Sequence, residues 1–269
     1  MASGLRERVP TALALAATVV AILLWTPPAV AVTVIALIML AGAWEWAGLA
    51  GLDTPLKRGG YVLAVAGGIA LDWWYTAGDA ERVVFLRATA LWWLLAFLWL
   101  VFAAQRGGRL AASIVGWIVL ATAAVSLARL VLVEPQGREL LLFLLVLIAA
   151  ADVGAYFGGR KFGRHRLAPR ISPGKTWEGF AAGMLAASAA AALGAVYFGV
   201  SLLPWLALCV LVALVSVVGD LVESRFKRRA GLKDSGSLLP GHGGVLDRID
   251  SVTAAAPVYL LGLLVLGVA

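Results

Sequence analysis

Two short acidic motifs contain the side chains of this sequence that are best suited to chemistry. One is D-x-x-E-S, which begins at Asp220, and the other is D-x-x-D-S, which begins at Asp247 and includes Asp250. Residues three and four positions apart lie on one face of a helix, so each motif presents its oxygen atoms together. If the two helix ends meet, they offer hard oxygen ligands that bind Mg²⁺ and leave positions for phosphate groups. We therefore predict a metal site formed by Asp220, Asp247 and Asp250.

Asp152 is a further candidate ligand for the same metal. It lies about two turns before the end of an apolar segment, one turn before Tyr156, and the glycines around it allow a second helix to approach closely. The alternative is that all these acids pair with neighbouring arginines at a membrane interface. That alternative stays open for Asp250 and Glu223, whereas the matching motifs favour metal binding by Asp220 and Asp247.

A lysine next to a predicted helix start forms a second candidate element, this time for phosphate. Lys175 lies in the segment SPGKTWEG, between Ser172 and the apolar run that follows Thr176. Free backbone N–H groups at a helix start, together with a lysine, favour an anion. The spacing is not that of a Walker loop. A simple helix cap explains Ser172 and Thr176 almost equally well.

The segment 224–250 is the densest polar stretch, with six basic residues, three aspartates and five glycines. The basic run 227–229 is typical of a solvated face or of contact with anionic lipid headgroups. Lys233 and Asp234 precede a glycine turn that contains His242, Gly243 and Gly244, where bare backbone can approach a ligand closely. His242 could act as a base, donate to phosphate or pack the loop, and a zinc site is not expected because His165 is the only other histidine.

These polar segments belong to a strongly apolar chain. Of its 269 residues 62% are hydrophobic and 14% are charged, and the mean hydropathy is +0.95. A soluble domain is nearer half apolar and a quarter charged, so we predict an all-α integral membrane protein. At about 20 residues per span, nine transmembrane helices are expected near 10–26, 29–50, 60–77, 83–104, 110–132, 139–159, 178–199, 202–223 and 250–268.

The basic residues indicate how these spans are oriented. All but four of the 22 lysines and arginines fall at the N-terminus or in loops after even-numbered spans; the four are Arg82, Arg87, Arg129 and Arg138. The positive-inside rule makes the basic face cytoplasmic, which puts the N-terminus in the cytoplasm and the C-terminus in the periplasm. The first apolar stretch is expected to remain as a helix and not to be removed as a signal peptide.

The chain divides by function into two regions of one membrane domain. Residues 1–138 are expected to be a scaffold, in which Glu45 is interpreted as a structural ion pair and Asp72 as a solvated interface residue. Residues 139–269 are expected to be catalytic, with cytoplasmic loops 160–177 and 224–249 opening a polar active-site funnel. The single cysteine, Cys209, excludes an intramolecular disulfide.

The spaced motif in 224–250 closely resembles the phosphatidate cytidylyltransferase (CDP-diacylglycerol synthase) family. The resemblance rests on Ser224, 226–228, Lys233-Asp234, Gly236, 239–240, 242–245 and 247–250. The segments 172–179 and 152–156 are also similar to that family, so the resemblance covers about residues 150–250. The first half resembles the family only in its hydropathy.

The resemblance implies a reaction of CTP with phosphatidic acid that gives CDP-diacylglycerol and pyrophosphate. It also implies Mg²⁺, allows a second cation such as K⁺, and suggests a homodimer in a bacterial inner membrane with no nucleic acid partner. The expected catalytic residues are Asp220, Asp247, Lys175, Lys233, Arg248 and His242. Ser172, Lys175, Thr176, Lys233, Asp234, Gly243 and Gly244 are expected to bind the nucleotide, and Asp220, Asp247, Asp152 and Asp250 the metal.

Three other functions fit parts of the pattern. A CTP-dependent polyprenol or dolichol kinase would use the same phosphate grip but needs a base for its alcohol. A cytidylyltransferase for an archaeol-type lipid would differ in the lipid alone. An ion-coupled transporter is disfavoured because the sequence has no evident paired repeat and its polar residues gather at one face.

Overall fold

The structure, a computed structural model, describes residues 14, 16–102, 108–236, 238 and 243–269. Within these residues a short helix, Ala16–Trp25, precedes eight long helices and one antiparallel hairpin. The elements are α2 (Pro28–Leu49), α3 (Pro55–Tyr75), α4 (Asp79–Phe102), α5 (Arg109–Val131), α6 (Gly137–Phe162), β1 (Arg166–Ala168), β2 (Ser172–Thr176), α7 (Trp177–Phe198), α8 (Leu202–Arg229) and α9 (Leu246–Leu266).

The described helices confirm an all-α membrane protein at the level of fold class. Seven of them are long and apolar enough to cross a membrane, namely α2 and α4 to α9. The predicted spans at 29–50, 110–132, 178–199 and 202–223 coincide with α2, α5, α7 and the first part of α8. Many large apolar side chains on these helices are exposed, including Leu37, Leu94 and Leu185, as expected for surfaces in contact with lipid.

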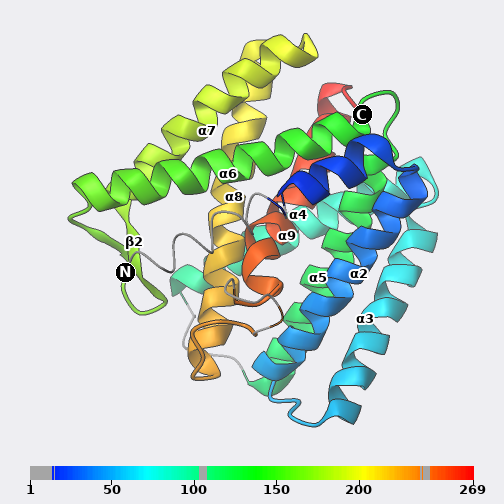
Figure 1. Cartoon of the computed structure of the whole chain (residues 1–269), viewed down its shortest axis with the longest axis vertical. Helices are drawn as coiled ribbons and strands as arrows, with labels where there is room; N and C mark the ends of the chain where they lie inside the picture. The colour runs from blue at the N-terminus through cyan, green and yellow to red at the C-terminus, as the bar shows by residue number, and fades with distance from the viewer. Residues whose placement is uncertain (1–13, 15, 103–107, 237, 239–242) are drawn as a thin grey trace.

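The helices form two groups joined by a central pair (Figure 1). On one side α2, α3 and α5 pack against one another, and on the other side α6 packs along α7. The central pair, α8 and α9, contacts both groups, α9 through α5 and α8 through α7. The ends of helices from both groups therefore meet around α8 and α9, where the acidic motifs lie.

Small residues allow α6 and α7 to approach closely, as the glycines near Asp152 led us to expect. A Cβ atom on Gly154 would lie 2.6 Å from the Cβ of Ala186, and one on Gly183 would lie 2.7 Å from the carbonyl oxygen of Ala151. Both distances are shorter than any real contact between such atoms. The glycines let the two backbones pack directly, which is a common way for membrane helices to associate.

The two predicted polar loops contain more regular structure than the sequence indicated. Helix α6 runs on to Phe162, and strands β1 and β2 pair antiparallel within the segment 160–177. Helix α8 continues to Arg229, and α9 begins at Leu246 instead of near 250. Hydropathy marks where a helix leaves lipid, but these helices continue through polar residues whose side chains find partners in the fold.

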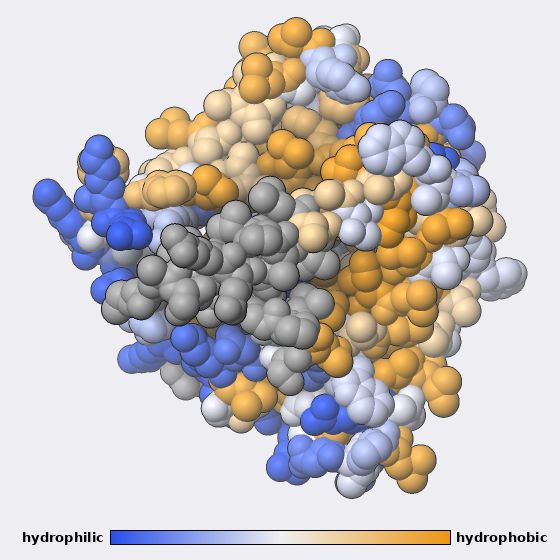
Figure 2. All heavy atoms as spheres, viewed as in Figure 1, coloured by the Kyte–Doolittle hydropathy of each residue, from blue (hydrophilic) through white to orange (hydrophobic). Residues whose placement is uncertain are grey.

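The surface separates apolar from polar regions (Figure 2). Hydrophobic residues cover the upper and right-hand parts of the view, whereas hydrophilic side chains gather at its left and lower edges, with a smaller group at the upper right. The hairpin labelled in Figure 1 lies at the left edge. Its arginines Arg164, Arg166 and Arg170 are all exposed.

Candidate functional site

The β hairpin carries Lys175 and is fixed at its base. Thr176 is the N-cap of α7 and accepts a hydrogen bond from Gly179 N at 3.1 Å. The Glu178 carboxylate, in the first turn of α7, accepts from Arg164 N at 3.0 Å and contacts His165 Nδ1 at 2.6 Å. Because β2 runs directly into α7, these contacts set the position of Lys175.

Lys175 forms an ion pair with the first acidic motif. Its Nζ lies 2.6 Å from Oδ2 of Asp220, and both side chains are about one quarter exposed. Ser224, one turn further along α8, donates from its hydroxyl to Oδ1 of Asp220 at 3.0 Å. The structure therefore joins the lysine segment and the D-x-x-E-S motif, which are some 45 residues apart in sequence, in one site.

Two more predicted carboxylates lie close to this ion pair. Asp152, on α6, interacts electrostatically with both Lys175 and Asp220. Asp250, on α9, interacts with Asp220, Lys175 and Lys227, and its Oδ1 accepts from Ser251 N at 2.6 Å. Helices α6 and α9 thus place Asp152 and Asp250 within electrostatic range of Asp220 and Lys175.

A second, more buried ion cluster continues from the first. Lys227 Nζ lies 2.9 Å from Oε1 of Glu223 and 2.6 Å from Oδ1 of Asp247. Glu223 is 1% exposed and Lys227 is 7% exposed. Among the described residues, neither oxygen of Glu223 accepts a well-aligned hydrogen bond, so its contact with Lys227 is a charge interaction.

Asp247 is engaged by protein donors on both oxygens. Besides Lys227 on Oδ1, Ser235 N donates to Oδ2 at 3.0 Å and to Oδ1 at 3.3 Å, and Gly244 N donates to Oδ2 at 2.9 Å. A carboxylate has about four acceptor positions. In this arrangement Asp247 holds Ser235 and Gly244 next to the start of α9.

Glu45 enters the site from the other half of the molecule. The sequence suggested a structural ion pair, but among the described residues its carboxylate contacts neutral donors. Ser235 Oγ donates to Oε2 at 2.9 Å, Leu246 N to Oε2 at 2.9 Å and Val245 N to Oε1 at 3.1 Å. Nothing in the sequence near Glu45 identifies these partners, which lie 190 or more positions away.

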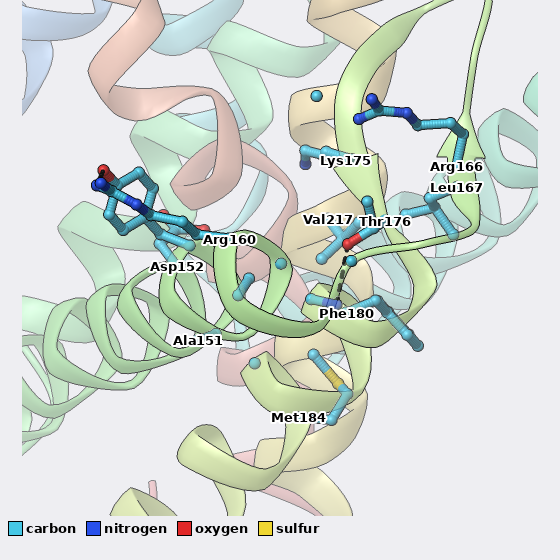
Figure 3. A pocket seen from close by; sticks show the side chains of 17 residues that line it. Ala151, Asp152, Arg160, Arg166, Leu167, Lys175, Thr176, Phe180, Met184 and Val217 are labelled. Atoms are coloured by element: carbon cyan, nitrogen blue, oxygen red, sulfur yellow. Dashed lines mark hydrogen bonds between the residues drawn. The ribbon is translucent and has the colours of Figure 1, made fainter.

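A cavity of about 510 Å³ opens beside Lys175, between α6, α7 and the hairpin. Figure 3 shows Arg160 and Asp152 on one side of it and Lys175 and Arg166 on the other, with Met184 and Phe180 below. The guanidinium of Arg160 donates to the Tyr156 hydroxyl at 3.1 Å. Cationic groups thus surround the upper part of the cavity, and apolar side chains form its lower wall.

The remaining predicted residues lie around this centre. Lys233, Asp234 and Arg248 are exposed, and Ser172 pairs with Ala168 in the hairpin. Gly243 has a φ of +79°, a conformation that favours glycine, and a Cβ there would lie 3.1 Å from Asp247 Oδ2. His242 lies outside the described residues.

The sequence interpretation assigned no place in the site to Glu45, Arg160 or Lys227, and for Glu223 it left an ion pair open but expected an arginine as the partner and not Lys227. Lys227 was assigned to a basic run with Arg228 and Arg229, which are exposed, whereas Lys227 is buried. Its spacing of four from Glu223 is the one local signal of a partner. Because charged residues are almost never buried without a partner, that spacing separates Lys227 from the two arginines that follow.

The donor set fits a magnesium ion that is bound together with a phosphate substrate. Asp152, Asp220, Glu223, Asp247 and Asp250 face two lysines, Lys175 and Lys227, so these seven side chains carry three more negative than positive charges when all are ionised. Among the described residues, no three acidic, histidine or cysteine side chains form a closed metal cage. Mg²⁺ usually binds through one or two carboxylates plus substrate phosphates and keeps several waters, so it needs no such cage.

Comparison with known proteins agrees with this chemistry. A family model described as the cytidylyltransferase family matches residues 6–266. The chain is 42% identical over 224 residues to a phosphatidate cytidylyltransferase of Pseudomonas aeruginosa, covering 81% of this chain and 82% of that protein. It is 39% identical over 282 residues to that of Haemophilus influenzae, covering 95% and 97% of the two chains. A match of 138 residues to that of Brucella suis is 51% identical and covers 48% of each chain.

Proposed function

Because the chain belongs to the cytidylyltransferase family, we propose that it transfers the cytidylyl group of CTP to phosphatidic acid, giving CDP-diacylglycerol and pyrophosphate. The observation that carries this proposal is the cavity beside Lys175. It combines phosphate-binding cations with an apolar wall between two helices that are long and apolar enough to span a membrane. A site for a lipid phosphate requires that combination.

The proposed reaction needs charge neutralisation more than proton transfer. An oxygen of the lipid phosphate attacks the α-phosphorus of CTP, and the bond from that phosphorus to the pyrophosphate oxygen breaks. A phosphomonoester has a second pKa near 6 and is largely ionised at neutral pH, so no base has to activate it. The obstacle is the approach of an anion to a polyanion, which positioned cations lower. Lys175 is the cation best placed for this role.

We assign the lipid phosphate to the cavity and the nucleotide to the glycine turn. Arg160 and Arg166 would hold the lipid phosphate, while Phe180 and Met184 would contact the first part of its acyl chains. Lys233 and Arg248 are on the side of the acidic motifs, where Gly243 and Gly244 would let backbone N–H groups approach the triphosphate. Ser172, Thr176 and Asp234 would shape the pocket between them, and His242 would donate to phosphate.

Asp220 would hold Mg²⁺ together with one neighbouring aspartate and the substrate phosphates, and the other carboxylates among Asp152, Asp247 and Asp250 would lie around the ion without all binding it at once. When bound, Mg²⁺ would offset the negative charge of the triphosphate. Glu223 and Lys227 would keep Asp247 in place from below. The number of carboxyl groups in the cluster, five against two lysines, also leaves room for a second, monovalent cation such as K⁺.

We further propose that the site faces the cytoplasm of a bacterium from its inner membrane and that the enzyme is a homodimer. The support for the orientation is the basic hairpin and the basic ends of α6 and α8, which carry Arg160, Lys161, Lys227, Arg228 and Arg229 in their last turns. CTP is available on that side. The dimer rests on the family resemblance alone.

The direct test is to incubate purified protein with Mg²⁺, phosphatidic acid and CTP labelled on its α-phosphorus. We expect labelled CDP-diacylglycerol and unlabelled pyrophosphate. Absence of labelled lipid from folded protein would refute the proposal. A parallel reaction with CTP labelled on its γ-phosphorus and a polyprenol in place of phosphatidic acid should leave the lipid unlabelled, whereas a lipid kinase would phosphorylate and label the alcohol.

A further inference from the structure

Glu45 is a buried carboxylate on α2 whose role is not explained by the ion pairs of the site. It is 3% exposed, and it lies between Trp44 and Trp46 in an otherwise apolar helix of the first half. Burying a carboxylate is costly unless it is compensated by hydrogen bonds. All the compensation seen among the described residues comes from one short region of the second half, residues 235–246.

Glu45 acts as the N-terminal cap of α9, supplied by another helix. The N-cap residue of α9, Val245, makes no side-chain capping bond of its own. The first N–H groups of a helix lack intrahelical partners, and a negative charge near them is favourable. Glu45 satisfies two of these donors, Val245 N at 3.1 Å and Leu246 N at 2.9 Å.

The same carboxylate holds the other end of the polar loop. Ser235 donates from its hydroxyl to Glu45 and from its backbone N–H to Asp247. Gly244 donates to Asp247, and Val245 beside it donates to Glu45. Glu45 and Asp247, from two different helices, therefore hold Ser235 on one side and Gly244 and Val245 on the other, with Lys233 and Asp234 immediately before Ser235.

Tight packing fixes Glu45 itself. A Cβ atom on Gly236 or on Gly244 would overlap the Glu45 carboxylate, so the loop backbone lies directly against it. Trp46, the next residue, donates from its indole to Ala112 O at 2.8 Å and packs on Phe226 with ring centroids 5.6 Å apart. A Cβ on Gly42 would lie 3.2 Å from Ile249 Cδ1. This part of α2 is thus docked on α5, α8 and α9 together.

We infer that Glu45 is a positioning residue for cytidylyl transfer, which sets the placement of Lys233–Asp234 and of the turn at Gly243–Gly244 for the triphosphate. The inference rests on the proposed function for the reaction and on the hydrogen bonds for the placement. Glu45 does not contact the cavity that we assign to the lipid, because that cavity is lined by residues of α6, α7, α8 and the hairpin. Glu45 should therefore affect turnover and the use of CTP but not the binding of the lipid.

The test compares Glu45→Gln with Asp72→Asn. Glutamine keeps the size of the side chain but places an NH₂ group against an N–H or O–H donor. We expect kcat to fall about 10- to 100-fold, as for a misplacement of about 1 Å near reacting groups, while KM for phosphatidic acid stays unchanged. Asp72→Asn removes a carboxylate from the same half of the chain without touching the loop, and should behave as wild type.

Hydrogen exchange followed by mass spectrometry provides the readout that does not depend on activity. In Glu45→Gln the amides in a peptide covering 243–250 should exchange about tenfold faster or more, as expected for loss of a hydrogen bond to a charged group. Exchange in α5 should not change. Equal exchange at 243–250 in the two proteins, faster exchange throughout the variant, or a rise in KM for phosphatidic acid would each overturn the inference. If wild-type protein makes no labelled lipid, the proposed function fails, and the exchange result still decides whether Glu45 orders the loop.

Discussion

Lys227 is the residue whose surroundings differ most from what its sequence context suggests. It lies in a row of three basic residues, but only it turns inward, to Glu223 and Asp247. Glu223 and Asp247 share one ammonium group there, and the carboxyl group of Asp250 lies nearby. The main role of Lys227 is therefore to compensate the charge of the buried Glu223 and Asp247 carboxylates and to hold Asp247 in its orientation.

Replacing Lys227 by methionine should destabilise the fold. The change leaves Glu223 and Asp247 buried without their cation, a loss on the order of 3–5 kcal/mol for a broken buried pair. The measurement is the thermal unfolding midpoint in detergent, followed with size-exclusion chromatography. Arg229→Met, two residues on and exposed, is the matched control and should unfold near the wild-type temperature. Equal midpoints for the two variants would contradict a supporting role for Lys227.

Asp220→Asn should reduce turnover without unfolding the protein. The amide keeps the hydrogen bond with Ser224 but removes the charge that pairs with Lys175 and would bind Mg²⁺. We expect kcat to fall about 10²- to 10³-fold, the scale of losing one electrostatic group at a reacting centre, and more Mg²⁺ to be needed for the remaining activity. Asp53→Asn, an exposed acid between α2 and α3, should have no effect. Turnover near the wild-type level across a Mg²⁺ titration would remove Asp220 from the metal site.

At the level of residues, the sequence indicates which side chains of the proposed site lie near one another, whereas their roles stay predictions. Asp152, Lys175, Asp220 and Asp250 could be identified because helical spacing and neighbouring turns indicate which side chains share a face. Glu45 could not be assigned a role, because its partners are backbone N–H groups far along the chain. Every residue except proline has a backbone N–H group, so the sequence does not show which of these groups donate to Glu45. Only the packing of α2 against α9 reveals them.

Elements were predictable where hydropathy alone determines them. The apolar middles of α2, α5, α7 and α8 were located closely from composition. The polar ends were not, because α8 continues through 224–229 and α9 begins at 246, where tertiary partners satisfy the polar groups. The hairpin was missed for a similar reason: strands of three and five residues are too short to show an alternating pattern.

Replacing a glycine by alanine should change the stability of the protein differently at two positions, one in the contact between α6 and α7 and one in α3. Gly154→Ala should destabilise the protein by about 1–3 kcal/mol, because the new methyl group overlaps Ala186 and pushes apart the helices that wall the cavity. Gly67→Ala in α3 meets nothing within 4 Å and should be neutral or stabilising by up to about 1 kcal/mol. Thermal midpoints that shift in the same direction would show that the direct backbone contact does not matter.

For the whole molecule, the arrangement of two helix groups around α8 and α9 leads to a test of orientation. The native cysteine, Cys209, is completely buried, so a single engineered thiol can report which side of the membrane it faces. Arg170→Cys on the hairpin should react with a membrane-impermeant maleimide from the cytoplasmic side. Asp79→Cys, at the start of α4, should react from the other side. Labelling of both from one side would refute the proposed orientation.

The contacts of Glu45 also have a consequence for how the protein is made. Glu45 and its partners are separated by 190 to 201 positions. A ribosome makes α2 before α9, so the Glu45 carboxylate lacks its hydrogen-bond donors until the start of α9 has been made. A chain released before α9 would contain Lys175 on the hairpin and Asp220 on α8, but it would lack Asp247, Arg248 and Asp250 together with the helix start that Glu45 caps, and it would remain inactive.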